Sequence, residues 1–150
     1  RRLAHNDLAL KLLMLEMGEL DLTQKNVDKF VNANSSFRSC SEAFEQLTFK
    51  VNRVAEAFED RDKLLSKKNI LITLYTILDD ISVSKLRPFM QYFEECRMSA
   101  QTSNNPSDED RRLNEFTRLL QQGADKKSSI QERKEIIQQY IQTFISLGWD

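Results

Sequence analysis

Residues that could act in catalysis or hold a metal are few in this chain. The one histidine is His5, and the two cysteines are Cys40 and Cys96. A zinc site needs four ligands, so these three residues would have to recruit a carboxylate. A histidine that acts as a general base needs converging partners, which a lone residue in a terminal helical turn does not have. We therefore predict no metal site and interpret His5 as a surface residue or a helix cap.

Two pairs of adjacent acids, Asp79-Asp80 and Glu94-Glu95, are the other candidates for chemistry. Carboxylate metal sites in helical bundles combine glutamates with a Glu-x-x-His motif, and this sequence contains no such motif. It also lacks a glycine-rich phosphate-binding loop. We interpret the acid pairs as solvated helix ends. We predict no enzymatic activity, no catalytic residues, no cofactor and no small-molecule substrate.

The charge balance argues against a polyanionic partner. The chain has 22 basic and 23 acidic residues, a formal net charge of -1, and its basic pairs at 67–68, 111–112 and 126–127 are flanked by acidic or polar residues. We therefore predict no nucleic-acid binding. The most apolar run, residues 70–78, is far shorter than the roughly 20 residues that cross a bilayer, so we also predict no membrane insertion.

The elements that would carry any binding residues are expected to be helices. The 150 residues include only three glycines and two prolines, whereas strand-rich folds need more turn residues. Leu, Lys, Glu, Gln and Ala dominate and favour helix. A chain of this length is expected to form one domain with its own core. We predict a single all-α domain over residues 1–150, built as a bundle of four to six helices.

One apolar seam organises the middle of the chain. Its a and d positions follow a heptad pattern and are Phe30, Phe37, Phe44, Val51, Phe58 and Leu65, with Ala33, Cys40, Leu47 and Val54. The pattern predicts a long helix over about 24–66. The run NANSSFRSCS at 32–41 weakens that prediction, because Asn and Ser compete with the helical backbone for hydrogen bonds. The alternatives are one continuous helix and a break within 33–40.

The positions that flank the seam indicate how it packs. They are mostly small or apolar rather than charged, which broadens the buried face and favours a bundle over an isolated two-stranded coiled coil. The seam is also longer than the short helices can easily cover. We therefore expect a homodimer that places part of the seam at its interface.

Later segments have their own signals. Eight of the twelve residues at 70–81 are Ile, Leu or Tyr, which predicts the most buried helix, with a buried strand as the alternative. Residues 99–107 are predicted to form a loop. Ser107 with Asp110 and Ser129 with Glu132 have the spacing of helix-capping boxes.

Aromatic residues are the candidates for partner binding. Phe49 lies at the f position of the heptad and must point away from the seam. Either another helix of the bundle covers it, or it anchors a partner, because buried aromatic residues dominate interface energetics. Phe30 and Phe37 on the seam, and Trp149 beyond the last expected helix, are the other candidate contacts.

These observations predict a non-enzymatic protein–protein interaction module. It would be a cytoplasmic helical scaffold, adaptor or tether domain that presents an apolar helix face or groove to a helical partner. The alternative is a secreted four-helix-bundle signalling protein of the cytokine type, favoured by the length, the two cysteines and the sequon at Asn34. A Cys40–Cys96 bridge would indicate the secreted protein, whereas two separate thiols fit the cytoplasm.

Overall fold

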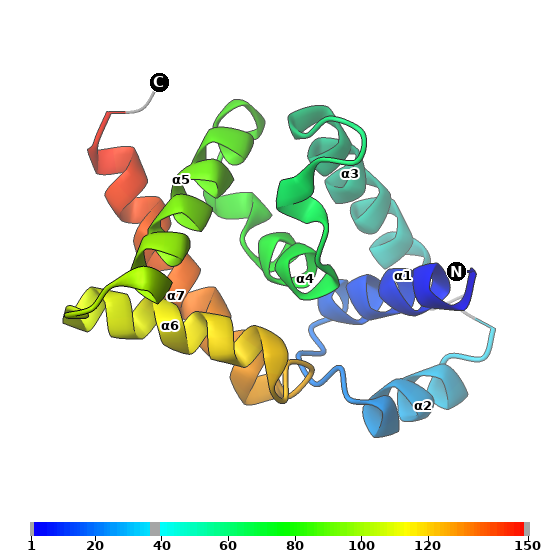
Figure 1. Cartoon of the computed structure of the whole chain (residues 1–150). Coiled ribbons are helices and arrows are strands. Elements are labelled where there is room, and N and C mark those ends of the chain that lie inside the picture. Colours follow the sequence, from blue (N-terminus) through cyan, green and yellow to red (C-terminus); the bar gives the residue numbers. More distant parts are fainter. Residues whose placement is uncertain (1, 37–39, 149–150) are drawn as a thin grey trace.

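A computed structural model describes the backbone of residues 2–36 and 40–148 and the side chains from residue 6 onward. Within these ranges the chain is helical and has no strand. The described residues form seven α-helices, labelled in Figure 1: α1 (Arg2–Glu16), α2 (Gln24–Ala33), α3 (Ser41–Ala57), α4 (Lys68–Thr76), α5 (Val83–Thr102), α6 (Asp108–Gln121) and α7 (Lys127–Ser146). Two short 3-10 turns, Lys63–Leu65 and Leu78–Asp80, flank α4. The all-α class is confirmed, and the described helices outnumber the four to six that we expected.

The helices pack around α4. In Figure 1, α1, α2 and α3 lie on one side of α4, and α5, α6 and α7 lie on the other. Helix α1 contacts α2, α3 and α4, and α5 contacts α3, α6 and α7. One cluster of buried apolar side chains runs from Leu12 on α1 to Phe144 on α7. The two sides therefore share a single hydrophobic core.

The prediction of one continuous helix over 24–66 is wrong. Helix α2 ends at Ala33, α3 begins at Ser41, and α3 ends at Ala57. Asn34 follows the last residue of α2, and both its backbone N–H and its side-chain Nδ2 donate to the carbonyl of Phe30, at 3.0 and 2.9 Å. This is the competition between an Asn side chain and the helical backbone that the sequence indicated. The break falls within 33–40, the alternative that the sequence left open.

The break changes which face of α3 is buried. Helix α3 packs on α1 and α5. Ala43, Leu47 and Val54 of α3, together with the flanking residues Cys40 and Phe58, are buried or half-buried. The a positions Phe44 and Val51 lie 42% and 43% exposed. Because α3 is a separate helix, it can turn about its axis, so that within α3 the d and g positions are turned toward the core while the a positions Phe44 and Val51 are exposed.

The apolar run at 70–81 is the centre of the core. Ile72, Leu74 and Ile77 are fully buried, and the segment is helical, so the alternative of a strand is wrong. The helix is shorter than the run, because α4 ends at Thr76 and the chain continues as a 3-10 turn over Leu78–Asp80.

The loops that border α6 are only partly as expected. Helix α5 extends to Thr102, so the loop predicted at 99–107 is shortened to 103–107. The capping box of Ser107 and Asp110 is confirmed by two hydrogen bonds of 3.1 and 3.0 Å. The box predicted at Ser129 is wrong, because α7 begins at Lys127 and buries Ser129 within its first turn.

Candidate functional site

The outward face of α3 carries the most exposed phenylalanine among the described residues. The side chain of Phe49 is 61% exposed, so the alternative in which another helix of this chain covers it is wrong. Phe49 lies on the side of α3 opposite Leu47 and Val54, which face the core. Phe44 and Val51 border the buried face of the same helix. Large apolar side chains are therefore exposed on more than one side of α3.

Three acidic side chains lie on the same helix face as Phe49. Glu42, Glu45 and Glu56 lie seven, four and seven residues from it, on the same side of the helix, and all three are exposed. The two basic residues of α3 are engaged with the rest of the protein. Lys50 lies 2.9 Å from Glu16, and Arg53 donates to the carbonyl of Ile81 at 3.1 Å. The outward face of α3 is therefore apolar at Phe49 and acidic around it.

A partly buried polar cluster holds α3 in place. Glu16 on α1 accepts a hydrogen bond of 2.7 Å from the Tyr75 hydroxyl of α4 and pairs with Lys50 of α3. The Lys50 ammonium also lies over the Tyr75 ring, 5.2 Å from its centroid. Burial raises the pKa of Tyr75, and the hydrogen bond to Glu16 raises it further. Three helices thus meet in this cluster, which fixes the direction in which α3 presents Phe49.

The structure does not place the other three candidate contacts, Phe30, Phe37 and Trp149, at the surface. Phe30 is only 8% exposed and packs in the core, so it does not lie on the surface. Phe37 and Trp149 lie outside the described residues, as does the side chain of His5. Of the four candidate contacts, Phe49 is thus the one that the structure places at the surface.

The acid pairs have structural partners. Asp79-Asp80 lies in the 3-10 turn after α4, as expected of a helix end, whereas Glu94-Glu95 lies in the middle of α5, so the interpretation as a helix end is wrong for that pair. Asp79 lies 3.6 Å from Arg53, and Asp80 accepts a hydrogen bond of 3.0 Å from Gln138. Glu94 pairs with Arg97 at 2.5 Å. Among the described residues, no group of His, Cys, Asp and Glu is arranged to hold a metal ion. No disulfide joins Cys40 to Cys96.

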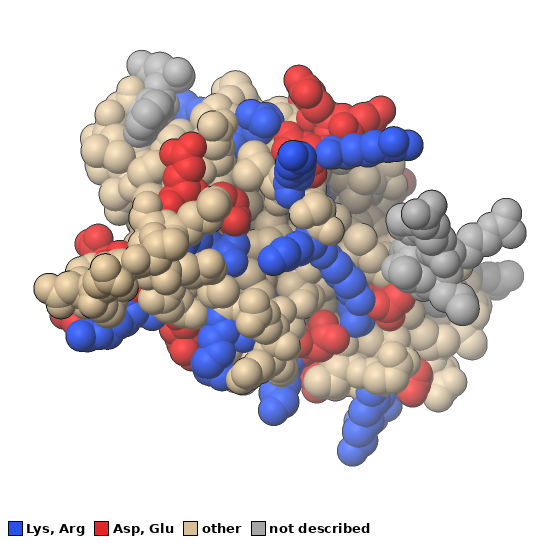
Figure 2. Space-filling model, in the orientation of Figure 1, with Lys and Arg blue, Asp and Glu red and all other residues tan. Residues whose placement is uncertain are grey.

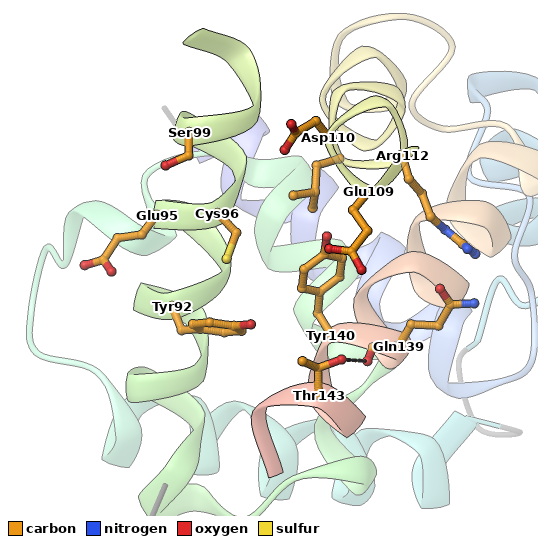
Figure 3. A pocket seen from close by; sticks show the side chains of 11 residues that line it. Tyr92, Glu95, Cys96, Ser99, Glu109, Asp110, Arg112, Gln139, Tyr140 and Thr143 are labelled. Carbon is orange, nitrogen blue, oxygen red and sulfur yellow. Dashed lines mark hydrogen bonds between the residues drawn. The ribbon is translucent and has the colours of Figure 1, made fainter. Parts of the chain in front are cut away.

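A cavity of about 510 Å³ lies between α5, the start of α6 and α7. Figure 3 shows Tyr92 and Cys96 from α5, Glu109 from α6 and Tyr140 from α7 around it. Tyr92, Glu109 and Tyr140 were not among the candidates from the sequence, and Cys96 was considered there as a zinc ligand or as half of a disulfide bridge. The signal that could have found this site is the spacing of Tyr92 and Cys96, which puts both on one side of α5.

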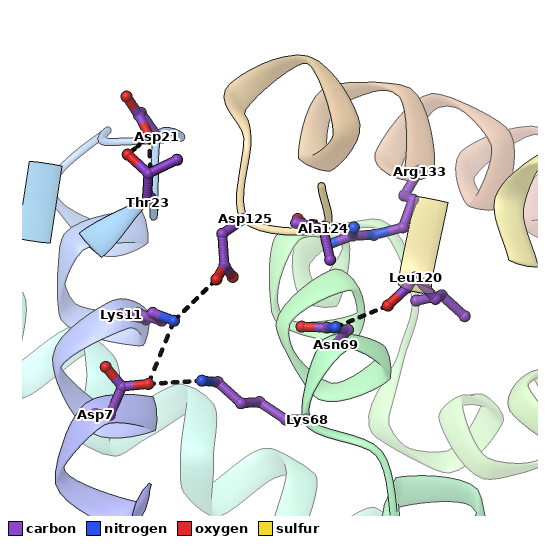
Figure 4. Close-up of polar contacts among 10 residues, drawn as sticks. All are labelled: Asp7, Lys11, Asp21, Thr23, Lys68, Asn69, Leu120, Ala124, Asp125 and Arg133. Atoms are coloured by element: carbon purple, nitrogen blue, oxygen red, sulfur yellow. Dashed lines mark hydrogen bonds and ion pairs between the residues drawn. The ribbon is translucent and has the colours of Figure 1, made fainter. Parts of the chain in front are cut away.

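Two polar clusters near the α6–α7 loop were also missed from the sequence. Figure 4 shows Lys11 of α1 between Asp7 and Asp125, with its Nζ 3.3 and 3.2 Å from their carboxylates. Arg133 of α7 is completely buried, and its guanidinium donates to the carbonyls of Leu119 and Ala124, each at 2.9 Å. These contacts tie the α6–α7 loop to the first and last helices. Their roles are structural.

The charged surface shows no region of one sign on the face drawn in Figure 2, where basic and acidic side chains are interspersed. Within the described ranges, no helix combines the length and the apolar character needed to cross a bilayer. Comparisons with protein-family models, with curated proteins and with solved structures found nothing that matches this chain.

Proposed function

We propose that this chain is a protein–protein interaction module that binds a basic amphipathic helix on the outward face of α3. The observation that carries the proposal is the 61% exposure of Phe49 on a helix that the core holds in place. An exposed phenylalanine loses contact with water when a partner covers it, and aromatic anchors contribute much of the binding energy at interfaces. A helical scaffold or adaptor of the cytoplasm would use such a face.

The charges around Phe49 define the partner's chemistry. Glu42, Glu45 and Glu56 lie before and after Phe49 on the same helix face, so a partner gains from an apolar residue against Phe49 and from Lys or Arg on either side. A helix meets these requirements when its apolar residues recur every three or four positions and basic residues flank them. Binding of this kind weakens as salt is added, because these charge pairs are exposed to solvent.

Affinity capture with matched variants tests the proposal. We expect Phe49→Ala to weaken capture of the partner by about 2 kcal/mol or more, which is roughly thirtyfold. Met98→Ala is the control, because Met98 is 66% exposed on α5 and its truncation removes a comparable apolar side chain elsewhere. Glu45→Lys should weaken capture as well. If Phe49→Ala and Met98→Ala retain the same proteins to the same extent, the proposal is wrong.

A second copy of the chain is the alternative partner for the exposed face of α3. Phe44 and Val51, the exposed seam positions, lie on α3 and could contribute to a homodimer. Sedimentation equilibrium distinguishes a monomer, which has a mass of 17.6 kDa, from a homodimer. A dimer that Val51→Glu dissociates and Phe49→Ala leaves intact would assign the seam to self-association and leave the Phe49 side of α3 for the partner.

A further inference from the structure

The cavity between α5, α6 and α7 is separate from the outward face of α3 and has its own chemistry. Its walls come from the middle of α5, the first two turns of α6 and the C-terminal half of α7. In Figure 3 the hydroxyl of Tyr140, the carboxylate of Glu109 and the thiol of Cys96 all lie toward the centre, and the ring of Tyr92 forms one side. A cavity of about 510 Å³ is within the range of small-ligand sites.

Both tyrosine rings are held from behind by the core. Tyr92 packs against Phe144, with ring centroids 5.6 Å apart, and Tyr140 packs edge-to-face on Phe93 at 5.4 Å. Phe93 and Phe144 are themselves buried. The tyrosine rings are therefore in place before any ligand arrives, so binding needs little ordering of side chains.

The cavity is acidic. Glu95, Glu109 and Asp110 line it, and Arg112 is the one basic residue among its lining side chains. In Figure 3 the guanidinium of Arg112 extends away from the tyrosines. The hydrogen bond drawn there runs from the Thr143 hydroxyl to the Gln139 carbonyl at 3.2 Å. No hydrogen bond is drawn in Figure 3 to the Tyr140 hydroxyl or to the Glu109 carboxylate.

The pKa values of the neutral groups agree with an acidic interior. Burial raises the pKa of Tyr140 to about 12, and the charge of Glu109 adds to the shift. Burial also raises the pKa of the Cys96 thiol; a hydrogen bond with Tyr92 partly opposes this shift, and the charges of Glu95 and Glu109 add to it. Each of these groups would become an anion on losing its proton, and nearby carboxylates oppose that. The same carboxylates favour a cation in the cavity.

We propose that this cavity binds an organic cation, an ammonium or guanidinium group, between Tyr92, Tyr140 and Glu109. The rings supply cation–π contacts, and the Glu109 carboxylate supplies a charge-assisted hydrogen bond. The cation is either a free small molecule or the side chain of a lysine or arginine in another polypeptide. A neutral molecule of the same shape lacks both interactions.

Titrations of the whole chain, followed by amide NMR, test the proposal with butylguanidinium and butylammonium as probes. We expect saturable shifts confined to residues 92–99, 107–113 and 139–143, and none from butylurea, the neutral analogue. Glu109→Gln should weaken binding by about fivefold, in keeping with the strength of an exposed charge contact. Glu59→Gln, which removes the same charge from the exposed loop after α3, should change nothing. Tyr92→Leu should also weaken binding, provided that its melting temperature matches that of the parent chain.

A second comparison identifies the source of the cation. A short capped peptide with a central arginine is titrated beside its citrulline counterpart and beside butylguanidinium. Tighter binding of the arginine peptide than of butylguanidinium assigns the cavity to a polypeptide side chain, and equal or weaker binding assigns it to a small molecule. Butylurea shifts equal to those of butylguanidinium, shifts spread over all acidic surfaces, or full binding by Glu109→Gln would each overturn the proposal.

Discussion

Arg133 on α7 donates a hydrogen bond from Nε to Oγ1 of Thr73 on α4, across 3.0 Å. Both residues are buried, and the Arg133 guanidinium also donates to the carbonyls of Leu119 and Ala124. Burial lowers the pKa of Arg133 to about 10. One buried cation thus joins α4, the end of α6 and the α6–α7 loop to the last helix.

We predict that Arg133→Met destabilises the fold by about 1–3 kcal/mol, because two buried carbonyls and one hydroxyl lose their donor. Urea unfolding measures the change. Lys134→Met is the control, since Lys134 is half-buried on the same helix, and should stay within about 0.5 kcal/mol. An unchanged or raised stability for Arg133→Met would mean that the cost of burying the charge exceeds the value of its hydrogen bonds.

Phe49 lies on α3 and Phe58 directly follows it, so the two phenylalanines can be compared as an exposed and a buried ring. Phe58 is 7% exposed in the core, whereas Phe49 is 61% exposed. We expect Phe58→Ala to lower the free energy of unfolding by about 3–5 kcal/mol, and Phe49→Ala to change it by less than about 0.5 kcal/mol. Thermal and urea unfolding measure both. A large loss for Phe49→Ala would show that the ring is covered in solution, for example by a second copy.

Asp62 should make stability depend on pH. Its carboxylate accepts a hydrogen bond from the Leu64 N–H at 3.0 Å and pairs with Arg87 at 2.8 Å, and these contacts lower its pKa in the folded state. A lowered folded pKa means that the contribution is present above the unfolded pKa and is lost as the pH falls through the folded pKa.

Asp62→Ala removes the cap and the ion pair together, and we expect it to cost about 0.5–2 kcal/mol at neutral pH. Asp62→Asn can still accept from Leu64 and should cost less. Urea unfolding over an acid series checks the sign, because the difference between Asp62→Asn and the parent chain should shrink as the pH falls. A difference that grows in acid would contradict the assignment.

The two thiols should differ in reactivity. Cys40 is fully buried, whereas Cys96 is half-buried beside the cavity and has a pKa raised by burial and by Glu95 and Glu109. We expect a thiol reagent to modify Cys96 before Cys40, more slowly than an unfolded thiol, and faster as the pH rises. Mass spectrometry of the labelled chain reads this out. Failure to label either cysteine after denaturation without reductant would point to the bridge expected of a secreted protein.

The heptad pattern predicted much of the N-terminal core but not its orientation. Cys40, Leu47, Val54 and Phe58 pack inward as their spacing indicated. Phe44 obeys the same pattern and is exposed, because the break after Ala33 lets α3 turn independently of α2. Periodicity fixes which residues share a helix face. It cannot say how much of that face the neighbouring helices cover.

The candidate sites were predicted less completely than the fold. The position of Phe49 away from the seam follows from the heptad, and the structure places it at the surface. Arg133 falls between Ile130 and Ile137 on the same helix stripe, but charged residues are normally assigned to solvent, so its burial was missed. The cavity needs three helices in contact, and the sequence offers no pattern for side chains that meet from separate elements.

The contact between Lys11 and Asp125 has a consequence for synthesis on the ribosome. The two residues are 114 positions apart, and the backbone N–H of Leu22 also donates to the carbonyl of Asp125 at 2.9 Å. Translation proceeds at about 5–20 residues per second, so the α6–α7 loop is synthesised on the order of ten seconds after α1. Leu12, Leu13 and Met14, which are buried in the finished chain, lack their complete packing during that interval. Helix α1 therefore completes its packing only after the α6–α7 loop has been synthesised.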